Sequence, residues 1–260
     1  MQGFQLNDEL AIEDGKFLVI AGPCAVEDRE QIIETAKFLR RLGVKVLRGG
    51  AYKPRTSPES FQGLGLEGLK LLAEAREATG LAIVTEVMDT SVMDEVSKYS
   101  DILQVGSRNS QNFALLKKIG HVGKPVLLKR GFGNTIDEFI SSARYVSNSG
   151  NHRVLLVERG IRTFESSMRF TLDIGAVPVL HSRVKFPVLV DPSHPAGLAE
   201  FVGSLALAGM GAGADGLMIE VHPNPDKAKS DSAQQLNFQQ FESLYGKMKK
   251  VTEAMGLQMI

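Results

Sequence analysis

Short apolar runs alternate along the chain with longer amphipathic segments, and this pattern repeats eight times from Phe17 onward. The apolar runs are rich in Val, Ile and Leu and carry almost no charge, which is typical of parallel strands that are buried on both faces. We predict strands at Phe17–Ile20, Val44–Leu47, Ala82–Thr85, Ile102–Val105, Val126–Leu128, Val154–Val157, Val188–Val190 and Leu217–Ile219.

The segments between these strands have the period of helices with one apolar face. In the first of them Ile32, Ala36 and Leu39 share one face, and charged residues occupy much of the opposite face. We predict helices at Arg29–Arg41, Leu66–Thr79, Ser91–Lys98, Gln111–Ile119, Ile136–Asn148, Ser166–Ile174, Leu198–Ala208 and Phe238–Met255. Glycines stand where several of these helices should end, which is the usual residue at a helix C-cap.

Eight strand–helix units without a break in composition predict an α/β protein built as a single (β/α)8 TIM barrel over residues 17–260. A doubly wound open sheet is the alternative. Residues 1–16 form a short N-terminal extension, in which a loose alternation and Asp14-Gly15 favour a hairpin that covers the bottom of the barrel. We expect no separate regulatory domain.

Composition narrows the function. The net charge is zero and no long basic run occurs, so the chain lacks the electrostatic signature of a nucleic-acid-binding protein. No apolar run approaches the roughly 20 residues that a membrane span requires, and the first residues lack a signal-peptide core. The single cysteine excludes an intrachain disulfide framework and fits a reducing compartment, so we expect a cytoplasmic location.

Polar or ionisable residues follow every predicted strand, whereas the strands themselves are nearly uncharged. They are Cys24 and Glu27 after the first strand, Arg48, Lys53 and Arg55 after the second, Glu86 after the third, Arg108 and Asn109 after the fourth, Lys129 and Arg130 after the fifth, Glu158 and Arg159 after the sixth, Asp191 and His194 after the seventh, and Glu220 and His222 after the eighth. In (β/α)8 barrels the active site lies at the C-terminal ends of the strands, so these residues are the candidates for chemistry.

One group of candidates consists of cations that come from several different strands. They are Arg48, Lys53, Arg108, Lys129 and Arg159. Burying several like charges together is costly unless anions compensate them, so the expected ligand carries both a phosphate and a carboxylate. The glycines and prolines of the loop at residues 48–58 suit a rigid backbone that approaches a ligand closely. A solvated basic turn is the alternative for this loop taken alone.

A second group consists of Cys24, His194, Glu220 and Asp231. A thiolate, an imidazole and two carboxylates suit a borderline divalent cation such as Mn²⁺, Fe²⁺, Co²⁺ or Zn²⁺. Their spacing matches no compact zinc signature, and only closure of the barrel would bring Cys24 next to His194. A lone cysteine after a strand is more often a small buried residue, so both interpretations of Cys24 stay open.

Seven segments, in order and without large gaps, carry a family resemblance. They are Ala21–Cys24, Arg48–Pro58, Gln104–Asn109, Lys129–Gly131, Glu158–Gly160, Asp191–His194 and Ile219–His222. Together they resemble the 3-deoxy-D-arabino-heptulosonate 7-phosphate (DAHP) synthases of the short type I subclass, which is related to the 3-deoxy-octulosonate 8-phosphate synthases. The resemblance covers nearly the whole chain from Phe17 onward.

The resemblance implies a barrel enzyme that condenses phosphoenolpyruvate with D-erythrose 4-phosphate and water, giving DAHP and phosphate in the first step of the shikimate pathway to chorismate and the aromatic amino acids. It implies a homo-oligomer, either a dimer or a tetramer. By position, the metal ligands would be Cys24, His194, Glu220 and Asp231, the phosphoenolpyruvate ligands would be Arg48, Lys53, Arg108, Lys129 and Arg159, and the erythrose 4-phosphate ligands would be Arg55 and Thr56. Mn²⁺ is the first choice of ion, with Fe²⁺, Co²⁺ and Zn²⁺ as alternatives.

Two further roles and three alternative functions follow from the same residues. Lys53 would protonate a developing alkoxide or leaving group, and Glu86 would orient the attacking water. The nearest alternative is a 3-deoxy-octulosonate 8-phosphate synthase, which uses arabinose 5-phosphate. In that family the loop is similar to Lys-Ala-Asn-Arg-Ser/Thr, whereas this chain has Lys53-Pro54-Arg55-Thr56. We therefore favour the four-carbon aldose. A metal-dependent aldolase needs fewer cations, and a non-catalytic protein would not need the metal ligands. Residues 180–186 depart from the family pattern and are expected to form a loop on the opposite rim.

Overall fold

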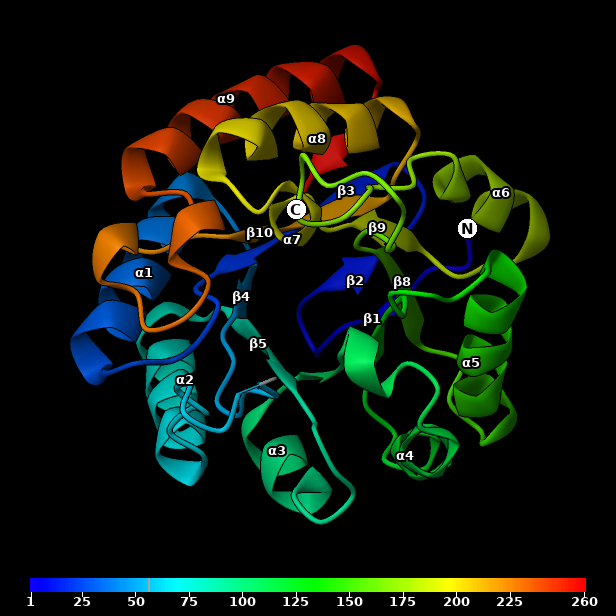
Figure 1. The fold of residues 1–260 in the computed structure, drawn as a ribbon, viewed down its shortest axis with the longest axis horizontal. Coiled ribbons are helices and arrows are strands. Elements are labelled where there is room, and N and C mark those ends of the chain that lie inside the picture. Colours follow the sequence, from blue (N-terminus) through cyan, green and yellow to red (C-terminus); the bar gives the residue numbers. More distant parts are fainter. Residues whose placement is uncertain (56) are drawn as a thin grey trace.

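The structure is a computed structural model that describes residues 1–55 and 57–260. Its centre is a closed barrel of parallel strands (Figure 1). The strands are β3 (Lys16–Gly22), β4 (Val46–Arg48), β5 (Ala82–Glu86), β6 (Ile102–Val105), β7 (Val126–Lys129), β8 (Val154–Glu158), β9 (Val188–Val190) and β10 (Gly216–Glu220). Because β10 pairs with β3 as well as with β9, the barrel has no open edge. This confirms the predicted (β/α)8 barrel and excludes the doubly wound sheet.

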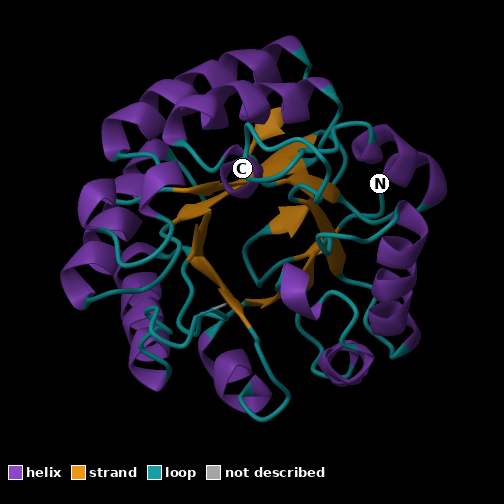
Figure 2. Cartoon of the chain, viewed as in Figure 1, coloured by secondary structure: helices purple, strands orange, loops and turns teal. Residues whose placement is uncertain are grey.

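Helices surround the barrel on the outside (Figure 2). They are α1 (Arg29–Leu42), α2 (Leu66–Thr79), α3 (Met93–Tyr99), α4 (Phe113–Gly120), α5 (Ile136–Asn148), α6 (Ala176–Arg183), α7 (Ser193–Ala196), α8 (Ala199–Gly211) and α9 (Phe238–Ala254), with 3-10 turns η1 (Ser107–Asn109), η2 (Pro225–Lys227) and η3 (Ser232–Gln234). Across the described part of the chain, no helix is long and apolar enough to cross a membrane.

One predicted helix was wrong. The segment Ser166–Ile174 lies in the loop between β8 and α6, where Ile161 and Thr171 exchange two backbone hydrogen bonds of 2.9 and 3.0 Å. The helix that leads to β9 is α6 instead, and it includes the residues from Leu180 to Arg183 that we expected in a loop. Pro178 lies in the first turn of α6, where its missing N–H breaks no helical hydrogen bond.

Side chains of successive strand residues point alternately outward and inward, and each set builds its own core. The outward set, which includes Val19 and Leu47, packs under the helices. The inward set fills the barrel and includes Leu18, Ile20 and Val46. All of these residues are fully buried. The apolar strand runs seen in the sequence therefore serve two separate cores.

An N-terminal hairpin closes one end of the inner core. It pairs β1 (Phe4–Gln5) with β2 (Ala11–Ile12) in antiparallel fashion, and Leu6 and Ile12 are buried among the inward strand residues. Figure 1 shows both strands within the ring of the barrel. The hairpin was predicted, but its turn lies at residues 6–10, and Asp14-Gly15 turns the chain from β2 into β3. A last short strand, β11 (Gln258–Met259), pairs with β3 beside it.

The barrel strand β3 ends at a glycine that no larger residue can replace without strain. Gly22 has φ +145°, and a Cβ built there lies 2.1 Å from the carbonyl oxygen of Arg48 on the neighbouring strand. We expect Gly22→Ala to lower the free energy of unfolding by about 3–5 kcal/mol, because it adds a backbone clash to an unfavourable φ. Chemical denaturation measures this loss.

Gly15→Ala is the matched control. Gly15 also has a positive φ, +83°, but a Cβ there meets nothing within 4 Å. This change should cost only the conformational term of about 1–2 kcal/mol. Equal losses in the two variants would show that the close approach of β3 and β4 is not what requires Gly22.

Candidate active site

The inward positions become polar at the C-terminal end of the strands. After one or two buried apolar residues, the next inward position on each strand from β4 to β10 carries a polar group. These residues are Arg48, Glu86, Gln104, Lys129, Arg159, Asp191 and Glu220, and each is less than one tenth exposed. The two-residue period that builds the inner core therefore also places a ring of functional groups in one layer at the mouth of the barrel.

All residues of this layer except Asp191 and Glu220 line a cavity of about 430 Å³. Eight lysine or arginine side chains line it, against two carboxylates, those of Glu86 and Asp231. Five of the eight are the cations predicted to bind phosphoenolpyruvate. Arg55, predicted to bind the aldose phosphate, lines the same cavity, and Thr56 lies outside the described residues. The imbalance of charge favours a multiply charged anionic ligand.

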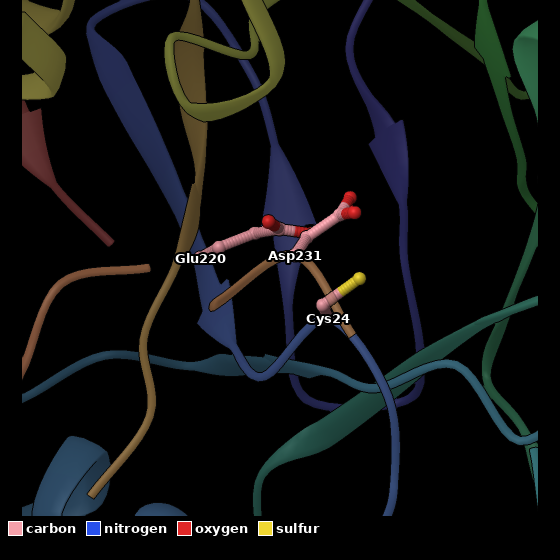
Figure 3. Close-up of side chains that lie close together, drawn as sticks. All are labelled: Cys24, Glu220 and Asp231. Atoms are coloured by element: carbon pink, nitrogen blue, oxygen red, sulfur yellow. The ribbon is translucent and has the colours of Figure 1, made fainter. Parts of the chain in front are cut away.

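Cys24, Glu220 and Asp231 converge where β3 and β10 meet (Figure 3). One ligand atom from each lies within 4.8 Å of the others. Nε2 of His194 is 3.4 Å from Oε1 of Glu220 and 3.9 Å from Oδ2 of Asp231. A metal ion with bonds of about 2.0–2.3 Å needs ligands about 3–4.5 Å apart. Cys24, Glu220 and Asp231 approach this spacing with one another, and His194 has it with Glu220 and Asp231.

Asp191 sets the orientation of His194. Its Oδ2 is 2.7 Å from Nδ1 of His194 and accepts a hydrogen bond of 2.6 Å from Nζ of Lys129. With Nδ1–H donated to this carboxylate, Nε2 presents a lone pair toward Glu220 and Asp231, which is the arrangement expected for a metal-binding histidine. Burial and then the charge of Asp191 act on the imidazole in opposite directions, and burial dominates, so the pKa of His194 lies below its ordinary value.

Lys53 covers the thiol of Cys24. Its Nζ donates to Sγ and to the carbonyl oxygen of Cys24, each at 3.0 Å. Burial, followed by repulsion from Glu220, raises the pKa of the Cys24 thiol to about 11. The thiol therefore becomes a thiolate at neutral pH only when a stronger local positive charge stabilises it. A divalent cation among these donors would supply that charge, so the residues fit such an ion.

The two carboxylates of this cluster are held by side chains around them. Glu220 accepts hydrogen bonds from Nη1 of Arg48 at 2.7 Å and from Nε2 of Gln234 at 2.6 Å. Burial opposes the ionisation of Glu220, but His194 and Arg48 outweigh it and keep its pKa below the ordinary value.

Asp231 is held in an unusual backbone conformation. It pairs with Arg169 at 3.2 Å, and its φ of +48° is the one positive value for a non-glycine residue in the described chain. Backbone strain of this kind concentrates at functional sites.

Glu86 lies on the other side of the cavity and has spare hydrogen-bonding capacity. Its Oε1 is buried and has no hydrogen-bond partner within residues 1–55 and 57–260, and its Oε2 accepts a long hydrogen bond of 3.4 Å from Gln104. A Cβ on Gly106 would lie 2.1 Å from Oε1, so this glycine makes room for the carboxylate. Burial raises the pKa of Glu86, although Lys53 and Lys129 act against it.

Two adjacent arginines differ in how they are held. Arg130 donates to Glu158 and to Asp173, both at 2.8 Å, so carboxylates of the protein use its donors. Arg159 is 3% exposed, and its Nε and Nη1 have no partner among the described residues. Burial lowers the pKa of Arg159 to about 10. Such unpaired buried donors are expected where a ligand supplies the acceptors.

The structure brings the described site residues predicted from the sequence to one mouth, and it adds residues that the sequence did not single out. The added ones are Gln104, Phe132, Arg162, Arg169, Phe170 and Gln234. Gln104 had a usable signal, because it occupies an inward position two residues from a buried one. Gln234 ends the short 3-10 turn η3 and the others lie in long loops, so no repeating pattern in the sequence marks them.

Comparison with known proteins gives a consistent result. Residues 4–256 match the model of the DAHP synthetase I family. The chain is 54% identical to the phospho-2-dehydro-3-deoxyheptonate aldolase of Thermotoga maritima over 249 residues, which cover 96% of this chain and 74% of that protein. It is 31% identical over 251 residues to the 2-dehydro-3-deoxyphosphooctonate aldolase of Syntrophobacter fumaroxidans, covering 90% of this chain and 86% of that one.

Solved structures agree. The crystal structure of the Thermotoga maritima phospho-2-dehydro-3-deoxyheptonate aldolase (DAHP synthase) superposes with a TM-score of 0.97 at 52% identity, covering all of this chain and 76% of that one. A truncated form of 3-deoxy-D-arabino-heptulosonate 7-phosphate synthase from the same organism gives a TM-score of 0.93 at 49% identity. This match covers all of our chain and 95% of the truncated one.

Proposed function

The chain belongs to the DAHP synthetase I family, and we propose that its cavity condenses phosphoenolpyruvate with D-erythrose 4-phosphate and water to give DAHP and phosphate, the first step of the shikimate pathway. The observation that carries this proposal is the juxtaposition of two features at one barrel mouth. Three metal-type donors, Cys24, Glu220 and Asp231, converge at the seam of the barrel with His194 beside two of them, and eight lysine or arginine side chains line the adjoining cavity. A phosphate and a carboxylate on one substrate would match those cations.

Phosphoenolpyruvate would occupy the cation-rich side of the cavity. Arg48, Lys53, Arg108, Lys129 and Arg159 would bind its anionic groups, since all five line the same space. Arg48 and Lys129 are fixed by ion pairs with Glu220 and Asp191, at 2.7 and 2.6 Å. Fixed cations hold a substrate in one orientation, and such positioning can contribute about 7–11 kcal/mol to lowering a barrier.

Cys24, His194, Glu220 and Asp231 would hold one divalent cation, with Mn²⁺ as the first choice and Fe²⁺, Co²⁺ or Zn²⁺ as alternatives. When bound, this ion would supply Lewis-acid polarisation of the aldehyde oxygen.

The chain's own residues would handle the protons and the water. Carbon 3 of the enol attacks the aldehyde carbon, and the alkoxide that forms takes a proton from Nζ of Lys53. Carbon 2 then accepts water oriented by Oε1 of Glu86, which faces no protein donor among the described residues. One proton of this water replaces the proton that Lys53 gave up, and the hydroxyl proton of the resulting hemiketal phosphate leaves with the expelled phosphate. A C–C bond and a C–O bond form, the bond from carbon 2 to the phosphate oxygen breaks, and carbon 2 becomes the ketone of DAHP.

The aldose is the point at which the two related activities differ. The heptulosonate relative is 54% identical and the octulosonate relative 31% identical, which favours erythrose 4-phosphate over arabinose 5-phosphate. The test measures phosphate release with phosphoenolpyruvate and each aldose in turn. A higher kcat/KM with arabinose 5-phosphate would overturn the proposed substrate.

Arg55 tests the position of the aldose phosphate. We expect Arg55→Ala to raise KM for erythrose 4-phosphate about tenfold to a hundredfold, because a charge-assisted hydrogen bond to phosphate is lost, and to leave KM for phosphoenolpyruvate nearly unchanged. Arg153→Ala is the control, since Arg153 bonds to the carbonyl oxygen of Gly123 and does not line the cavity. Weakened phosphoenolpyruvate binding alone would mean that the two phosphate positions are exchanged.

A further inference from the structure

Two phenylalanines from different loops stack in the wall of the cavity. Phe132 lies between β7 and α5, and Phe170 lies between β8 and α6. Their ring centres are 5.1 Å apart and the ring planes are 7° from parallel. Both line the cavity, and both are only partly buried. Apolar rings in a site lined chiefly by charged groups require a reason.

The guanidinium of Arg159 lies against both rings. Its Cζ is 4.8 Å from the centre of Phe132 and 4.3 Å from that of Phe170. The structure shows no hydrogen bond or ion pair for this side chain within the described residues, in contrast to Arg130, which two carboxylates hold. Aromatic faces thus take the place of carboxylates in holding Arg159. Because ring faces accept no conventional hydrogen bond, the N–H donors of the guanidinium stay available.

Phe132 also touches two other cations of the cavity. The Cζ atoms of Arg108 and Arg162 lie 5.6 and 5.3 Å from its ring centre. Three like charges repel one another, and the electron-rich ring face is a site against which guanidinium groups can gather. Phe132 therefore contacts more of the cavity's arginines than Phe170 does.

Backbone contacts fix both rings in place. The amide of Arg162 donates to the carbonyl oxygen of Phe132 at 2.8 Å, and the amide of Phe170 donates to that of Pro195 at 3.2 Å. Gly160 has φ +90°, and a Cβ there would lie 2.8 Å from the Cβ of Phe170. The loop after β8 thus turns at a glycine that allows Phe170 to approach the barrel.

We propose that Phe132 and Phe170 form an aromatic clamp, and that as positioning residues they hold Arg159 with its donors directed at an anionic oxygen of phosphoenolpyruvate. This inference rests on the proposed function, and it assigns the specificity of the cation cluster in part to two uncharged residues. A guanidinium held by carboxylates would bind an added anion more weakly, because its charge would already be compensated.

The test compares Phe132→Leu and Phe170→Leu with the parent enzyme. We expect KM for phosphoenolpyruvate to rise about three- to thirtyfold, with the larger effect in Phe132→Leu, because this is the range set by the loss of one or more desolvated cation–π contacts. KM for erythrose 4-phosphate should stay within about twofold, and Phe132→Tyr, which keeps the ring, should restore phosphoenolpyruvate binding.

The chain offers a matched control on its outer surface. Phe38 and Phe238 stack with centres 4.0 Å apart, and Arg41 lies 5.4 Å from the Phe38 ring, but none of these residues lines the cavity. Phe238→Leu should lower the thermal midpoint and leave both KM values unchanged. Arg159→Lys, alone and combined with Phe170→Leu, adds a double-mutant cycle, in which the two effects should be strongly non-additive.

Calorimetric titration with phosphoenolpyruvate separates the two possible failures. If the parent chain neither binds phosphoenolpyruvate nor releases phosphate from it, the proposed function is overturned. If the parent binds it and both leucine variants bind it equally well, or if the Arg159 and Phe170 effects simply add, the clamp is overturned while the function stands. Should Phe132→Leu fail to fold, Phe170→Leu and the cycle still decide the matter.

Discussion

Exhaustive treatment with EDTA is expected to abolish turnover, and added Mn²⁺ or a similar ion is expected to restore it. Within the described chain, three buried or half-buried candidate ligands converge within 4.8 Å at Cys24, Glu220 and Asp231, and none of these side chains could polarise an aldehyde without a bound cation. A Lewis acid contributes several kcal/mol of transition-state stabilisation in reactions of this kind, so its removal should reduce the rate below detection.

The histidines provide a matched pair for this experiment. His194 and His181 each lie beside an aspartate, at 2.7 Å from Asp191 and 3.4 Å from Asp215, but only His194 faces the other candidate ligands. His194→Ala should lose bound metal by elemental analysis, whereas His181→Ala should retain it. Full activity after chelation, with no metal found in the protein, would contradict the metal-dependent mechanism.

Replacement of Lys53 by methionine is expected to have the second largest effect. Nζ of Lys53 sits over the candidate metal cluster, and loss of a positioned proton donor typically lowers a rate by about 10²–10⁴. Methionine has a similar length and no charge, so Lys53→Met should lower kcat by that factor even at saturating phosphoenolpyruvate. Rapid-quench measurement of a single turnover distinguishes this loss of chemistry from slow product release.

Lys124→Met is the control, because it removes a half-buried lysine outside the cavity. Its Nζ donates to the carbonyl oxygens of Ser97 and Ser100, away from the cavity. Lys124→Met should reduce stability and leave kcat unchanged. If saturating phosphoenolpyruvate restored the full kcat of Lys53→Met, Lys53 would serve binding alone and the proton donor would have to be another group.

The barrel and most of the site were predictable because both follow from one short period. Strands that are buried on two faces have uninterrupted apolar sequences. The polar residue that ends each apolar run, such as Arg48 or Lys129, lies at the mouth of the barrel. The same rule explains Glu86, which lies two residues beyond an inward apolar position. Local patterns of this kind survive folding because the strand conformation fixes where each side chain points.

The loop after β8 was not predictable, since its conformation depends on distant partners. The segment at residues 166–174 was predicted to be a helix, but its apolar residues recur at every second position, and in the structure Arg169 pairs with Asp231 and Phe170 stacks on Phe132, both far away in the sequence. Tertiary contacts of this kind override a weak local propensity. The aromatic clamp was missed for the same reason, because nothing in the sequence around Phe132 shows which ring it will meet.

Closure of the barrel also determines when the candidate metal site can exist during folding. The seam of the barrel is the pairing of β3 with β10, in which Leu18 lies opposite Gly216 and Gly22 lies opposite Glu220. It joins chain segments about two hundred residues apart. Cys24 follows one side of this seam and Glu220 ends the other. A nascent chain thus carries only half of the ligand set until its last barrel strand arrives, and the order of assembly is set by loop closure. A cation bound by both halves would favour the closed barrel over every partly folded form, acting as a clasp across the seam.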